Sequence, residues 1–228
     1  MKTIGMIGGL SWESTQEYYR LINREVNKRL GDAHSASIRM YSFNFEEILE
    51  LNRNGDDKKI GKRLAKEAQK LENAGVDLIM LCANTAHEWA KEIKEKTNIP
   101  LLHIADATGI AIVNAGIQKV LLLGTKYTME RDFIKGKLDK KYGIEVVVPA
   151  KKDREEVSRI IYDELVRGQI KDSSRYFLLD LIKRHPQVNG IILGCTELPL
   201  LVKEEDCIVP LFNTTRLHAL AAVNFALE

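Results

Sequence analysis

The sequence has few of the features that mark secreted, membrane or nucleic-acid-binding proteins. It holds three cysteines, Cys82, Cys195 and Cys207, an odd number that favours free thiols over a disulfide framework. No apolar run is long enough to span a bilayer, and the first ten residues lack the apolar core and cleavage site of a signal peptide. Lysine and arginine (34) nearly balance aspartate and glutamate (32) without a basic block. We therefore predict a cytoplasmic protein with no membrane and no nucleic-acid partner.

Motifs for nucleotides and metals are also missing. Gly5, Gly8 and Gly9 form G-x-x-G-G, which is neither the dinucleotide pattern nor a phosphate loop, and a tight turn with a close backbone approach is the better interpretation. His87 begins "HEWAK", which lacks the second histidine of a zinc helix. No other His, Cys, Asp and Glu residues have the spacing of metal ligands. The sequence therefore predicts no metal.

Strand and helix patterns alternate along the chain. Apolar runs at 3–8, 76–82 and 119–124 are typical of buried strands, whereas the segments 12–30 and 57–74 have helical spacing. The 228 residues, 45% of them hydrophobic, can form two compact domains. This rhythm predicts an α/β protein with parallel sheets flanked by helices.

The chain also resembles itself. Three segments match later segments in the same order, with offsets that differ by a few residues, which favours an internal duplication. The matches are residues 76–85 on 188–197 (offset 112), residues 4–9 on 120–125 (offset 116) and Pro100 on Pro210 (offset 110). We expect a first α/β domain of residues 1–104 plus 211–228 and a second of residues 105–210.

Ligands of open parallel sheets bind beyond the carboxyl ends of the strands. The residues expected there are small, carry hydroxyl groups or, in one case, an amide, and suit a small anionic substrate. They are Gly8, Gly9, Ser11, Ala83, Asn84, Thr85, Thr125, Thr128, Cys195, Thr196 and Glu197.

Five segments together resemble the aspartate/glutamate racemase family, most closely its broad-specificity or L-aspartate/glutamate-specific branch. They are "IGMIGGLSWESTQEYYRLIN", "ANTAH", "LLHIADATG", "LLGTKYTMERDF" and "GCTELPLL". The resemblance implies two pseudosymmetric α/β domains with the active site in the cleft between them, usually in a homodimer. It also implies an amino-acid substrate, no cofactor, and one thiol on each face of the α-carbon.

Inversion at a stereocentre needs a base on one face and an acid on the other, each within hydrogen-bond reach of the carbon. Cys195 is the expected thiol of the second half. A helix beginning at residues 196–201 would lower its pKa, whereas an ionised Glu197 nearby would raise it.

The first half departs from the family pattern, because Ala83 stands where the resemblance places a cysteine. Cys82 cannot substitute, since successive strand residues point to opposite faces, and we predict that Cys82 is a buried core thiol. In the branch that this chain most resembles, the first position can also be threonine. Ala83 is either a natural departure or a deliberately replaced cysteine, and in both cases two-base racemisation should be impaired while the substrate pocket is kept.

The remaining candidates have two interpretations each. By the resemblance, Asn84 and Thr85 bind the α-carboxylate and ammonium of the substrate, but they could equally cap a helix. Thr125, Thr196 and Ser11 carry the same ambiguity, and Glu197 joins them as a substrate-binding candidate. Arg53 is a candidate for a second carboxylate, because a guanidinium matches a carboxylate bidentately.

The sequence therefore predicts a cofactor-independent racemase of aspartate, glutamate or related amino acids. A single-cysteine decarboxylase, or another isomerase of the same superfamily, is one alternative. An amino-acid-binding protein that has lost catalysis is another.

Overall fold

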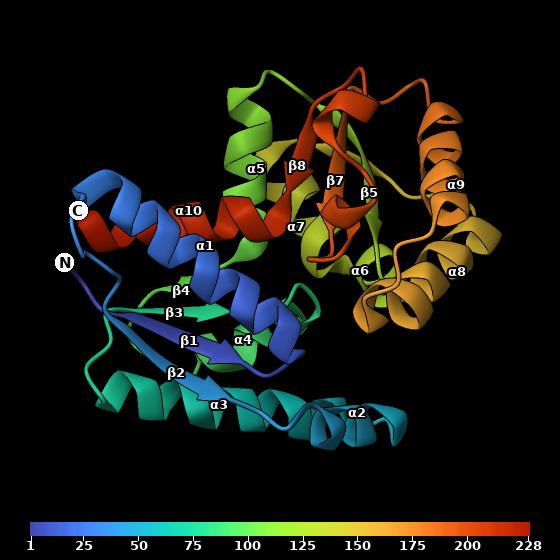
Figure 1. Ribbon diagram of the computed structural model, residues 1–228. Coiled ribbons are helices and arrows are strands. Elements are labelled where there is room, and N and C mark those ends of the chain that lie inside the picture. The colour runs from blue at the N-terminus through green and yellow to red at the C-terminus, as the bar shows by residue number, and fades with distance from the viewer. The chain divides into compact units, whose positions relative to one another are not determined.

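The computed structural model describes residues 1–228 and contains two four-stranded parallel sheets (Figure 1). The first sheet has the order β2-β1-β3-β4 and the second β6-β5-β7-β8. The strands are β1 (Ile4–Gly8), β2 (Ile38–Ser42), β3 (Leu78–Leu81), β4 (Leu101–Leu102), β5 (Lys119–Gly124), β6 (Glu145–Val147), β7 (Gly190–Gly194) and β8 (Leu211–Asn213). Equivalent strand orders confirm the predicted pair of pseudosymmetric α/β halves.

The sequence offsets reappear in the register of the sheets. β1 pairs with β3 at Ile4 and Leu78, and β5 pairs with β7 at Val120 and Gly190, which are the positions related by offsets 116 and 112. The outer pairs, Ile79 with Leu101 and Ile191 with Leu211, are related by offsets 112 and 110 in the same way. The repeat therefore extends from the sequence to the alignment of the backbones.

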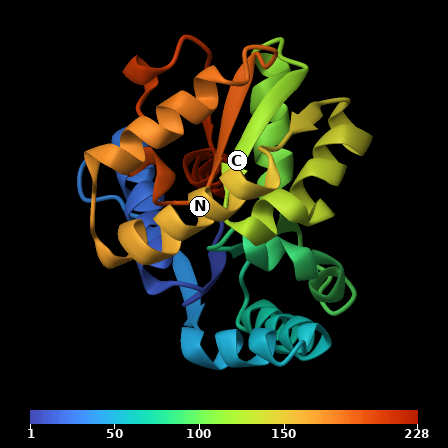
Figure 2. The same cartoon turned by 90° about the vertical axis from the view of Figure 1, so that its right-hand side faces the viewer.

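The chain divides into two compact units, residues 1–104 with 218–228 and residues 105–217. Residues 211–217, expected in the first half, lie in the second, because β8 forms hydrogen bonds with β7. The two chain ends meet in the first unit, where Lys2 N–H donates to Ala226 O at 2.9 Å, and both termini lie together in two views (Figure 2).

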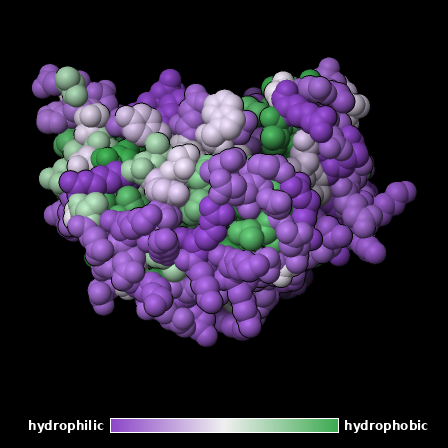
Figure 3. Space-filling model, turned by 90° about the horizontal axis from the view of Figure 1, so that it is seen from below, coloured by the Kyte–Doolittle hydropathy of each residue, from purple (hydrophilic) through white to green (hydrophobic).

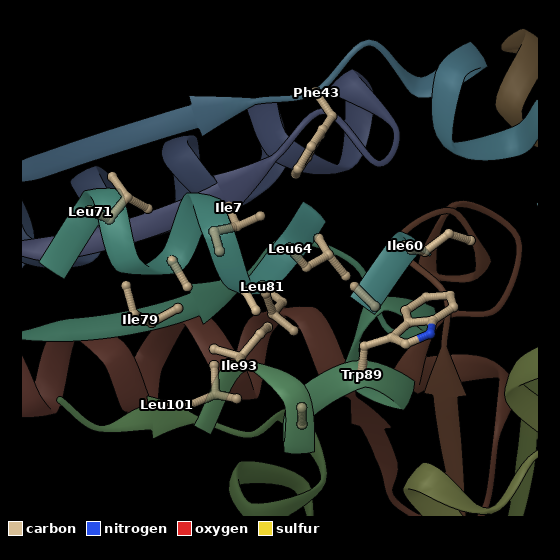
Figure 4. Packing of buried hydrophobic residues seen from close by; sticks show 14 of the residues in the cluster. Ile7, Phe43, Ile60, Leu64, Leu71, Ile79, Leu81, Trp89, Ile93 and Leu101 are labelled. Carbon is tan, nitrogen blue, oxygen red and sulfur yellow. The ribbon is translucent and has the colours of Figure 1, made fainter. Parts of the chain in front are cut away.

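Two apolar layers enclose the sheet of the first unit. On one face, α3 (Asp57–Asn73) and α4 (Ala90–Lys94) pack on the sheet, with Ile7, Leu64 and Leu81 at the centre of the layer (Figure 4). On the other face lie α1 (Trp12–Leu30) and α10 (Thr214–Leu227). Burial on both faces explains why β1 and β3 are continuously apolar instead of alternating.

Helix ends follow the capping residues of the sequence. Ser11 Oγ accepts from Ser14 N–H at the start of α1, and Gly31 ends that helix in a positive φ of 77°. Asn44 caps α2 (Phe45–Arg53) by accepting from Glu46 N–H. These contacts satisfy backbone donors that no earlier turn can bond.

The second unit has helices on both faces of its sheet (Figure 2). Its helical segments are α5 (Ile104–Asn114), α6 (Lys126–Glu130), α7 (Asp132–Tyr142), α8 (Lys151–Arg159), the π-helical turn η2 (Ile160–Glu164), η3 (Leu165–Arg167), α9 (Asp172–Lys183), and the short turns η4 (Leu198–Leu200) and η5 (Glu204–Asp206). Cys207 lies in the loop after η5, partly exposed, four residues before β8.

The surface that α3 presents is mostly hydrophilic (Figure 3). Its exposed residues include Lys58, Lys59, Lys62, Lys66 and Lys70. None of the helices combines the length and apolar character needed to cross a membrane.

Candidate active site

The turn after β1 brings backbone very close to its neighbours. Gly9 has a φ of 73°, and a Cβ at this position would lie 2.2 Å from Phe43 O. Its N–H donates to Thr15 Oγ1 at 2.9 Å. A Cβ on Gly8 would lie 2.4 Å from Thr15 Cγ2. The two glycines form the predicted tight turn, which allows α1 to begin directly beyond the strand end.

Cys82 and Ala83 belong to opposite faces of the first sheet. Cys82 is fully buried in the layer under α1 and α10, whereas Ala83 packs against the layer under α3. Burial raises the pKa of the Cys82 thiol far above its usual range. Cys82 is therefore the core thiol that strand alternation predicts.

Side chains outside the strand hold the backbone around Ala83. Ser14 Oγ donates to Cys82 O at 2.7 Å, and Cys82 N–H donates to Ile7 O at 2.9 Å. His87 Nδ1 lies 3.0 Å from Ala83 O. The carbonyl can only accept, so this ring nitrogen carries the proton. The sequence analysis did not single out Ser14, because its partner is 68 residues away.

Asn84 does not cap the helical turn η1 (Thr85–Trp89). Its side chain is only 8% exposed, and Oδ1 has no hydrogen-bond partner. A buried carbonyl without a donor costs about 1–3 kcal/mol. The capping interpretation is therefore wrong for the Asn84 side chain, whose buried oxygen has no donor.

Three imidazoles lie beneath this loop. The ring centroids of His87 and His103 are 4.8 Å apart, and those of His87 and His218 are 5.3 Å apart. His218 Nε2 lies 3.0 Å from Leu102 O, and Tyr18 Oη lies 3.0 Å from His218 Nδ1. Burial lowers the pKa of His87, and it lowers that of His218 to about 3. His87 and His218 are therefore neutral packing and hydrogen-bonding groups.

In the second unit, Cys195 follows β7 and is partly exposed. Its Sγ donates to Glu197 Oε2 at 2.8 Å, and Thr196 Oγ1 donates to the same oxygen at 2.8 Å. Glu197 itself is buried, with 8% exposed. The carboxylate thus collects two donors beside the thiol.

The expected helix after Cys195 is absent. The chain forms only the three-residue turn η4 at Leu198–Leu200, so no helix dipole favours a thiolate. Burial raises the pKa of Cys195 well above its usual range, and the charge of Glu197 acts in the same direction. Of the two opposing effects anticipated from the sequence, that of Glu197 prevails, and the thiol is protonated at rest.

Thr125 lies beside this group, after the neighbouring strand β5. Gly124 pairs with Gly194 across β5 and β7, so Thr125 and Cys195 follow paired residues. Thr125 Oγ1 caps α6 by accepting from Thr128 N–H at 3.3 Å. Its role in capping is therefore clear, and substrate binding by Thr125 stays a prediction.

The structure gives Ser11 and Arg53 their own partners. Ser11 caps α1. Arg53 lies at the exposed end of α2 and forms an ion pair with Glu46. This hydrogen bond raises the pKa of Arg53. Nowhere in residues 1–228 do three His, Cys, Asp or Glu side chains gather as a metal ion would need.

Tyr162 is a residue near the thiol that the sequence analysis missed. Burial raises the pKa of Tyr162 to about 12, and the charge of Cys195 acts in the same direction. The residue as a whole is 44% exposed. Tyr162 lies on the π-helical turn η2, a feature common at functional sites. That feature is not visible in sequence periodicity.

The fold and these strand-end groups define a class, the two-unit parallel α/β proteins with a cysteine directly after a buried strand. The family model described as "Asp/Glu/Hydantoin racemase" matches residues 7–222. The chain belongs to this family of isomerases.

Individual relatives agree with that assignment. The crystal structure of a candidate Asp/Glu racemase from Yersinia pestis is 49% identical, covers 100% of both chains and has a TM-score of 0.96. An aspartate racemase homologue from Pyrococcus horikoshii OT3 is 37% identical over 100% of both chains, with a TM-score of 0.87. The broad specificity amino-acid racemase RacX of Bacillus subtilis is 26% identical over 97% of this chain and 96% of its own.

Proposed function

We propose that this protein is a racemase of aspartate, glutamate or related amino acids, and that Cys195 carries the proton at the α-carbon without a cofactor. The observation that supports this most is the Cys195 thiol, partly exposed beyond β7 and hydrogen bonded to Glu197 at 2.8 Å. The names of the relatives, amino-acid racemase and aspartate racemase homologue, favour the same substrates.

Cys195 begins the reaction as an acid. Its raised pKa keeps the proton on sulfur, from which it can pass to a carbanion that a base on the other face of the α-carbon has formed. This chain has Ala83 on that side, so this direction needs the thiol of Ala83→Cys. In the reverse direction the thiol must first lose its proton. Glu197 Oε2 already accepts a hydrogen bond from the Cys195 thiol, so it can take the thiol proton and leave a Cys195 thiolate that acts as the base. Glu197 would thus be a proton partner of the thiol, in addition to its predicted role in binding.

Asn84 would bind the ammonium group of the substrate. Its buried Oδ1 lacks a donor, and an ammonium group supplies three. We keep Thr85 as a hydroxyl donor for the α-carboxylate and Thr196 as a substrate-binding residue, whose hydroxyl would have to leave Glu197 in order to donate to the substrate. Both are partly exposed beside strand ends. Arg53 is a weaker candidate for a second carboxylate, because its guanidinium is engaged by Glu46.

Ala83 leaves the first half without an acid or a base. Racemisation in both directions needs a second proton carrier on the other face of the carbon. We therefore expect Cys195 alone to exchange the α-proton of one enantiomer at most. A thiol at position 83 should restore inversion.

The test is α-proton exchange in deuterium oxide, followed by NMR with L- and D-aspartate and L- and D-glutamate. The parent is compared with Ala83→Cys, with Ala83→Ser as the control that adds a similar volume without a thiol, and with Cys195→Ser. Inversion in Ala83→Cys alone, lost again when Cys195→Ser is added, supports the proposal. If none of the variants exchanges any α-proton, the racemase proposal for these substrates is wrong.

A single-thiol decarboxylase is the second candidate, because this chain has only one thiol at the two equivalent strand ends. Decarboxylation needs protonation from one face only. Release of carbon dioxide from a disubstituted malonate, with no α-proton exchange on amino acids, would favour it. Binding of amino acids without either reaction would favour a protein that has lost catalysis.

We also propose a homodimer in the cytoplasm. The helices expose apolar side chains in both units, Trp12 and Tyr19 on α1 and Ile110 and Val113 on α5. Three free cysteines suit a reducing compartment. Light scattering after size exclusion should give twice the 25.9 kDa of one chain, and a mass of one chain would contradict the dimer.

A further inference from the structure

The strand that carries Cys195 ends in a glycine, which has no side chain to hold it. β7 lies between β5 and β8 (Figure 1), and its last residue, Gly194, pairs with Gly124 of β5. Cys195 follows directly, and the chain beyond it forms only the short turn η4. The position of the thiol therefore depends on contacts that other elements make with the end of β7.

One such contact comes from the methyl group of Thr128, on α6. Thr128 is fully buried. A Cβ on Gly124 would lie 3.0 Å from Thr128 Cγ2, and a Cβ on Gly194 would lie 3.1 Å from the same atom. A single methyl group thus fills the space beside both glycines, and its removal would leave a void at the end of β7.

The second contact is a hydrogen bond from Thr214, the first residue of α10. Thr214 Oγ1 donates to Leu193 O at 3.0 Å, and the residue is fully buried. Leu193 pairs with Asn213 of β8 and lies two residues before Cys195. The end of β7 is therefore held from both sides, by residues that follow β5 and β8.

Helix capping does not account for these two side-chain groups. At the start of α10, Asn213 Oδ1 accepts from Arg216 N–H at 3.0 Å. At the start of α6, Thr125 Oγ1 accepts from Thr128 N–H at 3.3 Å, and the two threonine hydroxyls lie 3.1 Å apart. The Thr128 methyl and the Thr214 hydroxyl take no part in these caps, and both contact the end of β7.

Equivalent support is found in the first unit. Ser14 Oγ, on α1, donates to Cys82 O at 2.7 Å. The repeat offset of 112 relates Cys82 to Gly194. In each unit, a hydroxyl-bearing residue of the helix after the first strand thus holds the residue directly before a strand-end position, Ala83 or Cys195.

We infer that Thr128 and Thr214 are positioning residues for Cys195. The methyl group of Thr128 and the hydroxyl group of Thr214 fix the end of β7, so that the thiol stays 2.8 Å from Glu197 Oε2. The inference rests on the proposed role of Cys195 as a proton carrier. Because a different group of each threonine makes the contact, substitutions that remove one group at a time separate the two contributions.

The test measures the pH dependence of Cys195 alkylation, which needs no turnover. In a Cys207→Ser background, the protein is treated with iodoacetamide over a range of pH, and mass spectrometry identifies the labelled cysteine. Burial and the charge of Glu197 raise the pKa of Cys195, and a thiol that is no longer held in place loses part of both effects. The midpoint of the alkylation profile then moves to lower pH.

Serine and valine should have opposite effects at the two positions. Thr128→Ser and Thr214→Val each remove the group that contacts β7. They should lower the midpoint by about one half to one pH unit, as expected when the thiolate and the carboxylate move apart by about 1 Å. Thr128→Val and Thr214→Ser keep the contacting group and should leave the midpoint at the parent value.

Thr97→Val is the matched control for the loss of a buried hydroxyl group. Thr97 Oγ1 donates to Ile93 O at 3.0 Å in the first unit, and loss of this bond should not move the midpoint. Fully buried Cys82 is labelled only when the first unit opens, and circular dichroism reports the helices of both units. If Thr214→Val does not fold, Thr214→Ala removes the same hydroxyl without adding a methyl group.

An unchanged midpoint in folded Thr128→Ser or Thr214→Val would overturn the positioning role of that residue. An equal shift from serine or alanine and valine at one position would assign the effect to general packing, and failure of every such variant to fold would assign both threonines to stability alone. Either result would also overturn the inference.

Kinetics separate this inference from the proposed function. In the Ala83→Cys background, Thr128→Ser and Thr214→Val should lower kcat for aspartate more than they raise KM, because they displace the thiol and not the substrate. Absence of all racemisation in Ala83→Cys itself would count against the proposed function. Unchanged alkylation midpoints would count against the two threonines.

Discussion

Replacement of Glu197 by glutamine should make Cys195 a stronger acid. The carboxylate oxygen lies 2.8 Å from Sγ, and its negative charge disfavours the thiolate. Glutamine keeps the size of the side chain and removes the charge. Its amide can also donate to a thiolate, so both changes lower the pKa of Cys195.

The distance sets the size of the effect. Two unit charges 2.8 Å apart interact with about 6 kcal/mol at an effective dielectric constant of about 20, which is equivalent to about four pH units. Cys195 is partly exposed, so water screens part of this energy. We expect the pKa to fall by about one to two units, and the rate of alkylation at neutral pH to rise by about tenfold or more.

The assay is the rate of iodoacetamide alkylation of Cys195 as a function of pH, in the Cys207→Ser background. Glu155→Gln is the matched control, because it removes the same charge from an exposed position on α8. The reasoning is refuted if Glu197→Gln leaves the pH profile in place or moves it to higher pH while Cys82 stays unlabelled.

Two further predictions concern stability. His218 has a pKa of about 3 when folded, against about 6.5 in an unfolded chain, so the unfolded state takes up the proton first as the pH falls. Urea unfolding should show a loss of about 2 kcal/mol between pH 6.5 and pH 5 from this residue, and His218→Gln should make the dependence on pH shallower. Gly9→Ala should cost about 2 kcal/mol or more in thermal unfolding, since its Cβ would meet Phe43 O. Gly55 has a similar φ of 71°, but there is open space where a Cβ would lie, so Gly55→Ala should cost less stability than Gly9→Ala. An equal loss of stability in the two variants would mean that the positive φ, and not the contact with Phe43, causes the effect.

Local chemistry made much of the first unit predictable. Ser11 and Asn44 cap helices because their side chains reach the first free N–H groups. Cys82 and Ala83 point to opposite faces because strands alternate with a period of two. The two sheets share one register, because residues that match in the sequence repeat occupy equivalent positions in the two halves.

The surroundings of Cys195 depended on contacts that no local pattern records. The segment after Cys195 has residues that tolerate a helix, but the chain turns after Leu200, and η4 is too short to act on the thiol. Tyr162 lies on a π-helical turn whose Glu164 accepts a hydrogen bond from Ser174. That hydrogen bond joins elements that only tertiary packing brings together, so no local pattern of the sequence indicates it.

Both units carry an energetic cost at the strand ends where ligands of parallel sheets bind. In the first, the Asn84 carbonyl is buried without a donor. In the second, buried Glu197 faces a thiol whose ionisation it opposes. Buried Glu164, by contrast, accepts hydrogen bonds from Arg159 and Ser174. Strain of this kind is typical of sites that a ligand completes. An ammonium group would satisfy Asn84, and a carbanion would take the proton that Glu197 keeps on Cys195. Each unit thus carries a cost that one chemical feature of the proposed amino-acid substrate would relieve.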